Sequence, residues 1–268
     1  LSGTVETSAA DGSGPDKGSH VVGFSRRMEG WAEYVALPTA DFAVIPQAVD
    51  EPDAATLPVA GLTALYALER CERMLGTKVL ITGATGGVGS IAVMVLSRMS
   101  YTVHAVTGKK DKHDYLKDLG AKNIIDRKEF QGESKLLEKG IWDGVVDTVG
   151  GESLTKILAQ TKPSGIVAAC GNAGGIKLNT SVMPFIIRGV KLWGIDSSAS
   201  SMKRREFAWN EVKNLVDFNK LKSLTKEHSL EDLLKIYPKM LKGEIFGRIV
   251  INPNKFIWLI FEVFLTPS

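Results

Sequence analysis

The sequence predicts an α/β protein with a doubly wound parallel sheet and a second, smaller β domain, and three observations lead to this prediction. A β-branched run at residues 78–82 ends in a glycine-rich turn at 83–89, and an apolar helix follows directly. From residue 77 to residue 196, short apolar runs alternate with helical stretches, as in β-α-β units with right-handed crossovers. Before residue 46, short β-type segments lie close together, which is typical of a small barrel or sandwich.

The N-terminal region is expected to form short strands, because turn residues separate its alternating segments. These strands are expected at residues 1–6, 21–24, 31–36 and 42–45. An apolar helix is expected over residues 54–68, since the acidic residues just before it favour a helix N-terminus.

The α/β region supplies the remaining elements. Its later strands are expected at 101–106, 123–125, 142–147, 165–169 and 190–196. Helices are expected from Ser90 onward and at 112–119, 153–160, 202–216 and 230–241. A late strand at 247–251 is set apart and can rejoin the β domain. The predicted domains are residues 1–47 with 199–254, residues 48–198, and an apolar tail at 255–268.

Composition and charge exclude several classes of protein. At 268 residues, with 44% hydrophobic and 24% charged residues, the chain can bury a substantial core. A net charge of +3 without a basic run argues against a nucleic-acid partner. Two cysteines, Cys71 and Cys170, form no disulfide framework, so a reducing cytoplasm is expected and both thiols are expected to be buried.

No signal peptide or membrane span is expected. The apolar run at 256–265 has ten residues, too few to span a bilayer, and Glu262 interrupts it. A strand or tail packed on the core is therefore expected there, and no membrane partner.

The turn at Thr85-Gly86-Gly87-Val88-Gly89 predicts a dinucleotide site. The amides at the start of the following helix, together with the helix dipole, favour a bound pyrophosphate. Ala84 stands where the usual motif has its first glycine, which weakens the motif taken alone. The alternative is an ordinary strand–loop–helix turn.

The residues after the second strand predict NADP(H). An NAD site favours Asp or Glu about 20 residues after the glycines, where it binds the ribose 2′-hydroxyl. Here the chain reads Thr107-Gly108-Lys109-Lys110, and a hydroxyl with two ammonium groups suits a 2′-phosphate. The alternative is a solvated lysine loop. A short-chain dehydrogenase is not expected, because no tyrosine is followed four residues later by lysine.

Several separated motifs carry a family resemblance. Glu33-Tyr34-Val35, residues 57–64 and residues 84–89 resemble the medium-chain dehydrogenase/reductase superfamily, and within it the zinc-free quinone oxidoreductases. Further motifs are similar to the quinone oxidoreductase branch of the acryloyl-CoA reductase type. They lie at residues 115–121, 147–150, 168–171, 183–190 and 194–197.

This resemblance implies a Rossmann domain beside a GroES-like catalytic domain. It places residues 86–89 at the pyrophosphate and Thr107, Gly108 and Lys109 at the 2′-phosphate of NADP(H). The full set of cofactor-binding candidates is Thr85, Gly86, Gly87, Val88, Gly89, Thr107, Gly108, Lys109, Arg127, Asn172, Ile186 and Ser197. Arg127 is implied at the adenosine end, and the last three at the nicotinamide half. The alternatives are a surface charge for Arg127, a core position for Ile186 and a strand-end hydroxyl for Ser197.

Zinc is not expected. Val59 stands where the zinc-dependent alcohol dehydrogenases of the superfamily carry a cysteine ligand. A structural zinc site needs four close cysteines, and no two of the four histidines are spaced as a metal pair.

The implied activity is hydride transfer from NADPH to a quinone or to the activated double bond of an acryloyl-CoA-like thioester. Two alternatives stay open: a general enone or enal reductase, and an NADPH-binding protein without turnover. No residue is assigned as proton donor: Tyr34 is available, but a strand tyrosine is more often structural. The resemblance also implies that the family chain begins before Leu1, and that about half of the GroES-like domain is missing, which leaves turnover open. The resemblance further implies a homodimer, joined through the sheet edge at Val190–Ile195.

Overall fold

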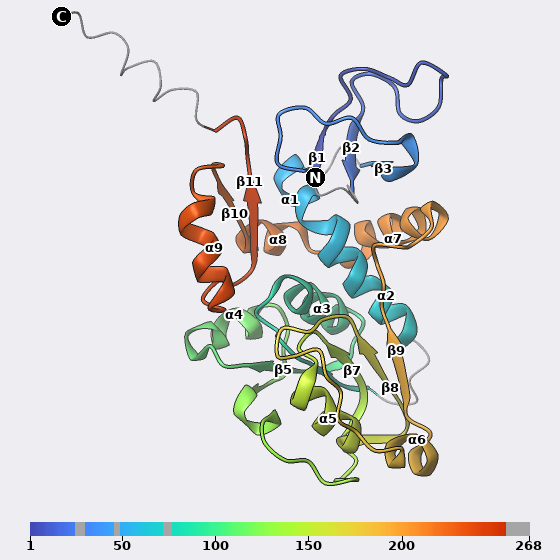
Figure 1. The fold of residues 1–268 in the computed structure, drawn as a ribbon, viewed down its shortest axis with the longest axis vertical. Coiled ribbons are helices and arrows are strands. Elements are labelled where there is room, and N and C mark those ends of the chain that lie inside the picture. Colours follow the sequence, from blue (N-terminus) through green and yellow to red (C-terminus); the bar gives the residue numbers. More distant parts are fainter. Residues whose placement is uncertain (25–29, 46–48, 72–76, 256–268) are drawn as a thin grey trace, which may run out of the picture. The chain divides into compact units, whose positions relative to one another are not determined.

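The largest element of the fold is a parallel sheet. The computed structural model describes residues 1–24, 30–45, 49–71 and 77–255 (Figure 1). Within them, the strands pair in the order β6-β5-β4-β7-β8-β9, and every pair is parallel. The strands are β4 (Lys78–Ile81), β5 (Thr102–Thr107), β6 (Asn123–Asp126), β7 (Trp142–Asp147), β8 (Thr161–Ala169) and β9 (Lys191–Gly194). This confirms the predicted doubly wound sheet, whose strand order reverses between β4 and β7.

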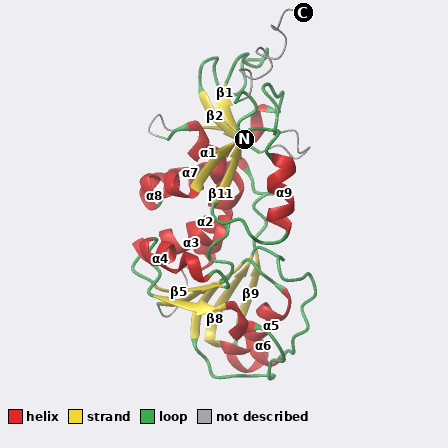
Figure 2. Ribbon diagram, turned by 90° about the vertical axis from the view of Figure 1, so that its left-hand side faces the viewer, coloured by secondary structure: helices red, strands yellow, loops and turns green. Residues whose placement is uncertain are grey.

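Helices cover both faces of this sheet (Figure 2). Helices α2 and α3 pack together over one face, while α5 and α6 pack on β8 from the other. The helices of this part are α2 (Leu62–Cys71), α3 (Gly87–Arg98), α4 (His113–Asp118), α5 (Gly151–Gln160), α6 (Met183–Arg188) and α7 (Met202–Leu215). Short 3-10 turns lie at Lys110–Lys112 and Arg127–Phe130. Because both faces are covered, the centres of β4 and β7 are apolar, and Leu80 and Val145 are fully buried.

The predicted helix at 54–68 is longer than expected and contains a π turn. It runs from α1 (Glu51–Thr56) through the π turn at Leu57–Gly61 into α2. Pro58 lies in this turn and has no N–H to donate, so a local change in hydrogen bonding is expected there. At the other end, the Asp50 carboxylate caps α1 by accepting from the Asp53 N–H at 3.1 Å.

The remaining strands form two small sheets. An antiparallel sheet joins β1 (Ser2–Thr4), β2 (His20–Gly23) and β3 (Phe42–Val44), and a 3-10 turn at Thr39–Asp41 precedes β3. A parallel pair joins β10 (Thr225–His228) and β11 (Arg248–Ile251). Helices α8 (Phe218–Leu224) and α9 (Leu233–Leu241) flank β10 in the sequence.

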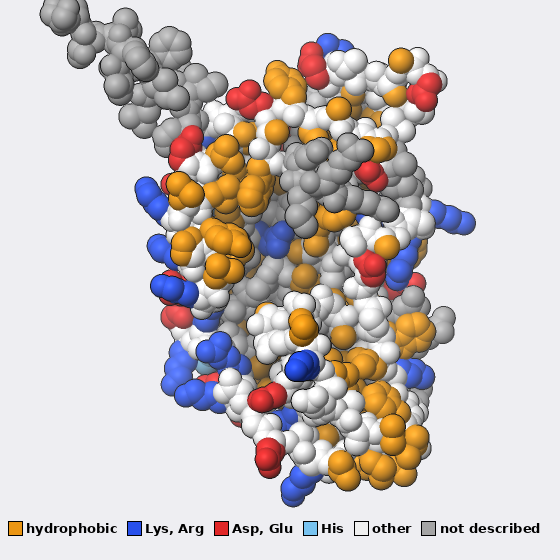
Figure 3. Space-filling view, in the orientation of Figure 1, with side chains coloured by type: hydrophobic (Ala, Val, Ile, Leu, Met, Phe, Trp, Pro, Cys, Tyr) orange, Lys and Arg blue, Asp and Glu red, His pale blue; other side chains and the backbone are white. Residues whose placement is uncertain are grey.

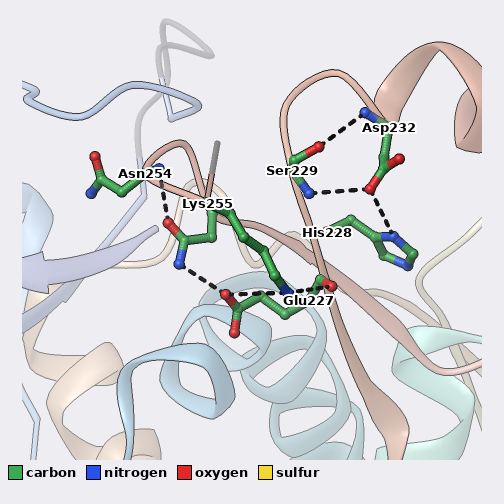
Figure 4. A network of polar contacts seen from close by, with 7 residues as sticks. Glu227, His228, Ser229, Asp232, Asn254 and Lys255 are labelled. Carbon is green, nitrogen blue, oxygen red and sulfur yellow. Dashed lines mark hydrogen bonds and ion pairs between the residues drawn. The ribbon is translucent and has the colours of Figure 1, made fainter. Parts of the chain in front are cut away.

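A network of polar contacts connects the ends of β10 and β11 (Figure 4). Lys255 donates to the carbonyl of Glu227 at 3.1 Å, and Asn252 donates to its carboxylate at 2.8 Å. Ser229 and Asp232 form a reciprocal pair before α9, in which each side chain accepts from the other backbone N–H at 3.4 Å. These contacts fix the late strand that the sequence predicted at 247–251.

Two predictions about this part were wrong or incomplete. The segment 31–36 is not a strand: Trp31 and Tyr34 are exposed, and the residues have no ladder partner among the described strands. Helix α8 and strand β10 were not predicted, because Thr225–His228 carries no apolar alternation. The apolar run at 256–265 lies outside the described residues, as does the side chain of Cys71.

The chain divides into two compact units, Leu1–Pro58 with Phe218–Ser268, and Val59–Asp217. Helix α7 belongs to the same unit as the parallel sheet. The predicted domain boundary at 198/199 had placed it in the other domain. The reason for the observed grouping is that α7 packs on α2, where Arg204 forms an ion pair with Glu69 at 2.7 Å. The roles of the two domains stay a prediction.

Candidate functional site

The glycine turn lies at the carboxyl end of β4, where the strand order reverses. Gly83 has a φ of +56°, and the Gly86 N–H donates to its carbonyl at 2.8 Å. Helix α3 then begins at Gly87. A Cβ added at Gly89 would lie 2.8 Å from the Cα of Ala84, so only glycine allows the helix to approach the strand this closely.

The start of α3 provides backbone donors. The N–H groups of Gly87, Val88 and Gly89 belong to the first turn, where no carbonyl of the same helix can accept from them. Because the helix dipole adds partial positive charge, this turn fits an anionic pyrophosphate. Ala84 is fully buried, and its N–H donates to the Val106 carbonyl of β5 at 3.1 Å, so the turn tolerates a methyl group there.

Two buried threonines connect the glycine turn to the end of β5. The hydroxyls of Thr85 and Thr107 lie 3.4 Å apart, and Thr107 Oγ1 accepts from the Lys109 N–H at 3.1 Å. The predicted pyrophosphate and 2′-phosphate residues are therefore neighbours.

Basic side chains gather beyond Thr107. A Cβ on Gly108 would lie 2.6 Å from Nε of Arg127, so the Arg127 side chain covers this glycine directly. Burial lowers the pKa of the Lys109 ammonium, and the charges of Lys112 and Arg127 lower it further, while Asp111 opposes them. Mutual repulsion among these cations favours an anion between them.

A buried carboxyl group lies beside the same turn. Asp147, at the end of β7, accepts from the Thr82 hydroxyl at 2.7 Å and from the Gly150 N–H at 2.9 Å. Burial raises the pKa of Asp147, and these hydrogen bonds oppose the rise. Cys170, whose N–H donates to the Asp147 carbonyl at 2.8 Å, has its pKa raised by burial to about 12, so its thiol is not a nucleophile at neutral pH.

The three residues implied at the nicotinamide half occupy different positions. Asn172 is exposed in the loop after β8, and its carbonyl accepts from the Gly175 N–H at 3.0 Å. Ser197 follows β9, the strand that pairs with β8, so both lie at carboxyl ends of neighbouring strands. Ile186 lies on α6 and is 68% exposed, which excludes the alternative that it is a core residue.

Ile186 is not joined to the other two by any contact that the described residues show. The Arg188 side chain of the same helix donates to the carbonyls of Ala159 and Thr161, both at 2.9 Å, at the amino end of β8. The role of Ile186 stays a prediction.

Sequence reasoning missed Thr63 on α2. Its buried hydroxyl lies 2.7 Å from Oγ of Ser197, although 134 residues separate the two in sequence. The only signal was its place within the motif at residues 57–64.

Within 1–24, 30–45, 49–71 and 77–255, no three His, Cys, Asp or Glu side chains are grouped as metal ligands, and Val59 is partly exposed. None of the helices formed by these residues combines the length and the apolar character that a bilayer crossing needs.

Comparison with known proteins gives consistent matches. The family described as zinc-binding dehydrogenase matches residues 87–218. The chain is 38% identical over 262 residues to the acrylyl-CoA reductase AcuI of Ruegeria pomeroyi, a match that covers 95% of the chain and 79% of the relative.

Two solved structures are similar in fold and sequence. YhdH of Escherichia coli K-12, crystallised with NADPH, is 37% identical with a TM-score of 0.86, over 93% of this chain and 79% of that one. YhfP of Bacillus subtilis, crystallised with NAD, is 35% identical with a TM-score of 0.86, over 94% of this chain and 79% of that one.

Proposed function

The chain belongs to the medium-chain dehydrogenase/reductase superfamily, and from this premise we propose that it is an NADPH-dependent reductase of an activated carbon–carbon double bond. The observation that carries the proposal is a series of contacts that connects the glycine turn, through Thr85 and Thr107, to the basic residues around Gly108. In the proposed site, the pyrophosphate would lie at the glycine turn and the 2′-phosphate beside Gly108.

Each of these groups of residues would bind one part of the coenzyme. The first-turn amides of α3 would bind the pyrophosphate, and Gly89 keeps the helix close enough to the strand for them to do so. Lys109 and Arg127 would hold the 2′-phosphate, because two cations beside the Thr107 hydroxyl suit a dianion. Asn172 and Ser197 would contact the nicotinamide half, and Ile186 is proposed there on the resemblance alone.

The chemistry follows from orientation. When bound, the reduced nicotinamide supplies a hydride to the β-carbon of an enoyl thioester or to a quinone. The residues of this chain bind and orient the coenzyme, and rigid strand ends position them for that purpose.

The choice of NADPH over NADH can be measured directly. Fluorescence titration should give tighter binding of NADPH than of NADH, and Arg127→Ala should weaken NADPH binding about tenfold while leaving NADH nearly unchanged. Lys128→Ala, which changes the neighbouring exposed residue, is the matched control. Equal affinity for the two coenzymes in the unmodified protein would refute the assignment of Lys109 and Arg127.

We propose an acryloyl-CoA-like thioester as substrate, because the relative from Ruegeria pomeroyi is an acrylyl-CoA reductase. A quinone or a general enone is the alternative. NADPH oxidation measured with acryloyl-CoA, 1,4-benzoquinone and an enone separates the three. Coenzyme binding without oxidation of NADPH in the presence of any of the three substrates would leave a binding protein without turnover.

We also propose a homodimer through the sheet edge at Val190–Ile195, which contains strand β9. This strand ends the sheet order, so one of its sides faces no strand among the described residues. Apolar side chains gather over the neighbouring α6 (Figure 3), where Val182, Ile186 and Ile187 are exposed. Light scattering should give twice the mass of the chain, and Ile187→Asp should lower it, whereas a monomeric unmodified protein would refute the dimer.

A further inference from the structure

The turn that carries Ser197 is held by its own acidic residue. It joins β9 to α7, and the Asp196 carboxylate accepts from the N–H groups of Ser198 and Ala199 at 3.0 and 3.1 Å. The Ser198 hydroxyl also donates to this carboxylate at 2.7 Å. Three donors on one oxygen fix the turn locally.

A buried arginine holds the same turn from its other side. Arg205 lies in the first turns of α7 and is only 7% exposed. Its guanidinium donates to the carbonyls of Ser197, Ser198 and Ser200, at 3.4, 3.0 and 3.3 Å. The guanidinium has five N–H donors in a rigid planar fork, whereas a lysine ammonium has three on a flexible stem.

Thr63 fixes the side chain of Ser197. The Thr63 hydroxyl donates to the Val59 carbonyl at 2.5 Å, one helical turn earlier, and lies 2.7 Å from Oγ of Ser197. Thr63 is the donor in this contact too, so its one proton is shared between the Val59 carbonyl and Oγ of Ser197. The proton of Ser197 and its second lone pair are then left for a group other than Thr63.

Helices α2 and α7 are fastened to each other independently of this turn. Arg204 forms its ion pair with Glu69 and stacks over the ring of Tyr66 at 4.2 Å. Thr63, Tyr66 and Glu69 are spaced by three residues on α2, so they share one face. Thr63 therefore lies on a helix that is joined to α7, the helix that follows the Ser197 turn.

From these contacts we propose that Thr63 and Arg205 are positioning residues, which hold the Ser197 turn in the geometry that receives the carboxamide end of the coenzyme. The inference rests on the proposed function and deepens it. Neither residue needs to touch the coenzyme, because each acts through the turn. A turn fixed before binding loses less conformational entropy when the ligand arrives.

The test uses the full chain and three probes: NADPH, its analogue with an acetyl group in place of the carboxamide, and 2′,5′-ADP, which contains the adenosine half alone. Thr63→Val keeps the shape of the side chain and removes the hydroxyl. It should weaken NADPH binding about three- to tenfold, leave 2′,5′-ADP binding unchanged and weaken the analogue less. Thr63→Ser should restore NADPH binding to within about twofold.

Thr161→Val is the matched control. Thr161 is also fully buried and donates to the carbonyl one helical turn earlier, that of Ile157, at 2.8 Å. This variant should lower stability as Thr63→Val does, without changing the affinity for NADPH. Arg205→Lys should change the binding of the three probes in the same way as Thr63→Val. If Arg205→Lys does not fold, the Thr63 variants alone test the inference.

Two results would overturn this inference and leave the proposed function standing. One is that Thr63→Val binds NADPH as tightly as the unmodified protein, and the other is that it loses equal affinity for NADPH and for 2′,5′-ADP. The second result would mean general damage to the fold. Failure of the unmodified protein to bind 2′,5′-ADP would overturn the proposed function, and this inference with it.

Discussion

The Thr82 hydroxyl donates a hydrogen bond of 2.7 Å to the carboxylate of Asp147, and this contact joins the ends of β4 and β7 at the point where the strand order reverses. Both residues are fully buried. Thr82 Oγ1 in turn accepts from the Thr148 N–H at 2.9 Å, so the hydroxyl links the two strands in both directions. The glycine turn begins at the next residue, Gly83, so its position depends on this pair.

We expect the two residues to be energetically coupled. Thr82→Val and Asp147→Asn each leave a buried polar group with fewer partners and should each lower the free energy of unfolding by about 1 to 3 kcal/mol. In the double variant the losses should overlap by about 1 to 2 kcal/mol, since each single change already breaks the shared hydrogen bond. Urea unfolding of the four proteins measures this coupling. Strictly additive losses would show that the contact has no net stabilising effect.

The glycine at position 89 should be irreplaceable. Gly89→Ala places a methyl group against the backbone of residues 83 and 84, which cannot move without shifting β4. NADPH binding should fall by at least about tenfold, with a lower melting temperature as a second effect. Gly3→Ala is the control, because a Cβ there meets nothing within 4 Å. A Gly89→Ala protein that binds NADPH normally would contradict the proposed role of this turn.

The sequence predicted the parallel sheet well, for a physical reason. Strands such as Lys78–Ile81 are buried on both faces, so they leave short apolar runs in the sequence, and here a glycine turn follows. Strand β10 left no such pattern, because Thr-Lys-Glu-His is stabilised by its pairing with β11 and by the contacts of Glu227. The segment 31–36 was wrongly predicted as a strand for the opposite reason: its sequence suggested alternation, but it pairs with none of the strands that the structure describes.

The site was predictable where it is local in sequence. The glycine turn follows β4, and Thr107–Lys109 lies at the end of β5. Because these two strands pair in parallel, the two segments are expected to lie side by side. Thr63 and Arg205 reach Ser197 through the packing of α2 on α7, which no short motif encodes. Their contribution could be found only from the three-dimensional contacts.

Coenzyme preference should respond to a change at Gly108. Gly108→Ala places a methyl group 2.6 Å from Nε of Arg127, and this flexible side chain must move away. NADPH binding should weaken several-fold, while NADH binding stays nearly constant because NADH has no 2′-phosphate. The ratio of the two dissociation constants, measured by fluorescence, is the readout. The same ratio as in the unmodified protein would show that Arg127 does not act at the phosphate.

Asp53 on α1 should make the stability of its own unit depend on pH. Burial raises the pKa of Asp53 from 3.8 to about 6, the nearby charge of Asp50 adds to this, and the Thr225 hydroxyl opposes it by donating at 3.1 Å. Because the folded state holds the proton more tightly, this contribution to stability is fully present below pH 3.8. It is lost as the pH rises through about 6.

Asp53→Asn removes the charge and keeps an oxygen that can accept from Thr225. The variant should therefore be more stable than the unmodified protein at pH 8, by about 2 kcal/mol, and the difference should vanish near pH 4. Urea unfolding at several pH values measures this difference. A constant difference between Asp53→Asn and the unmodified protein across this range would show that Asp53 titrates with an ordinary pKa.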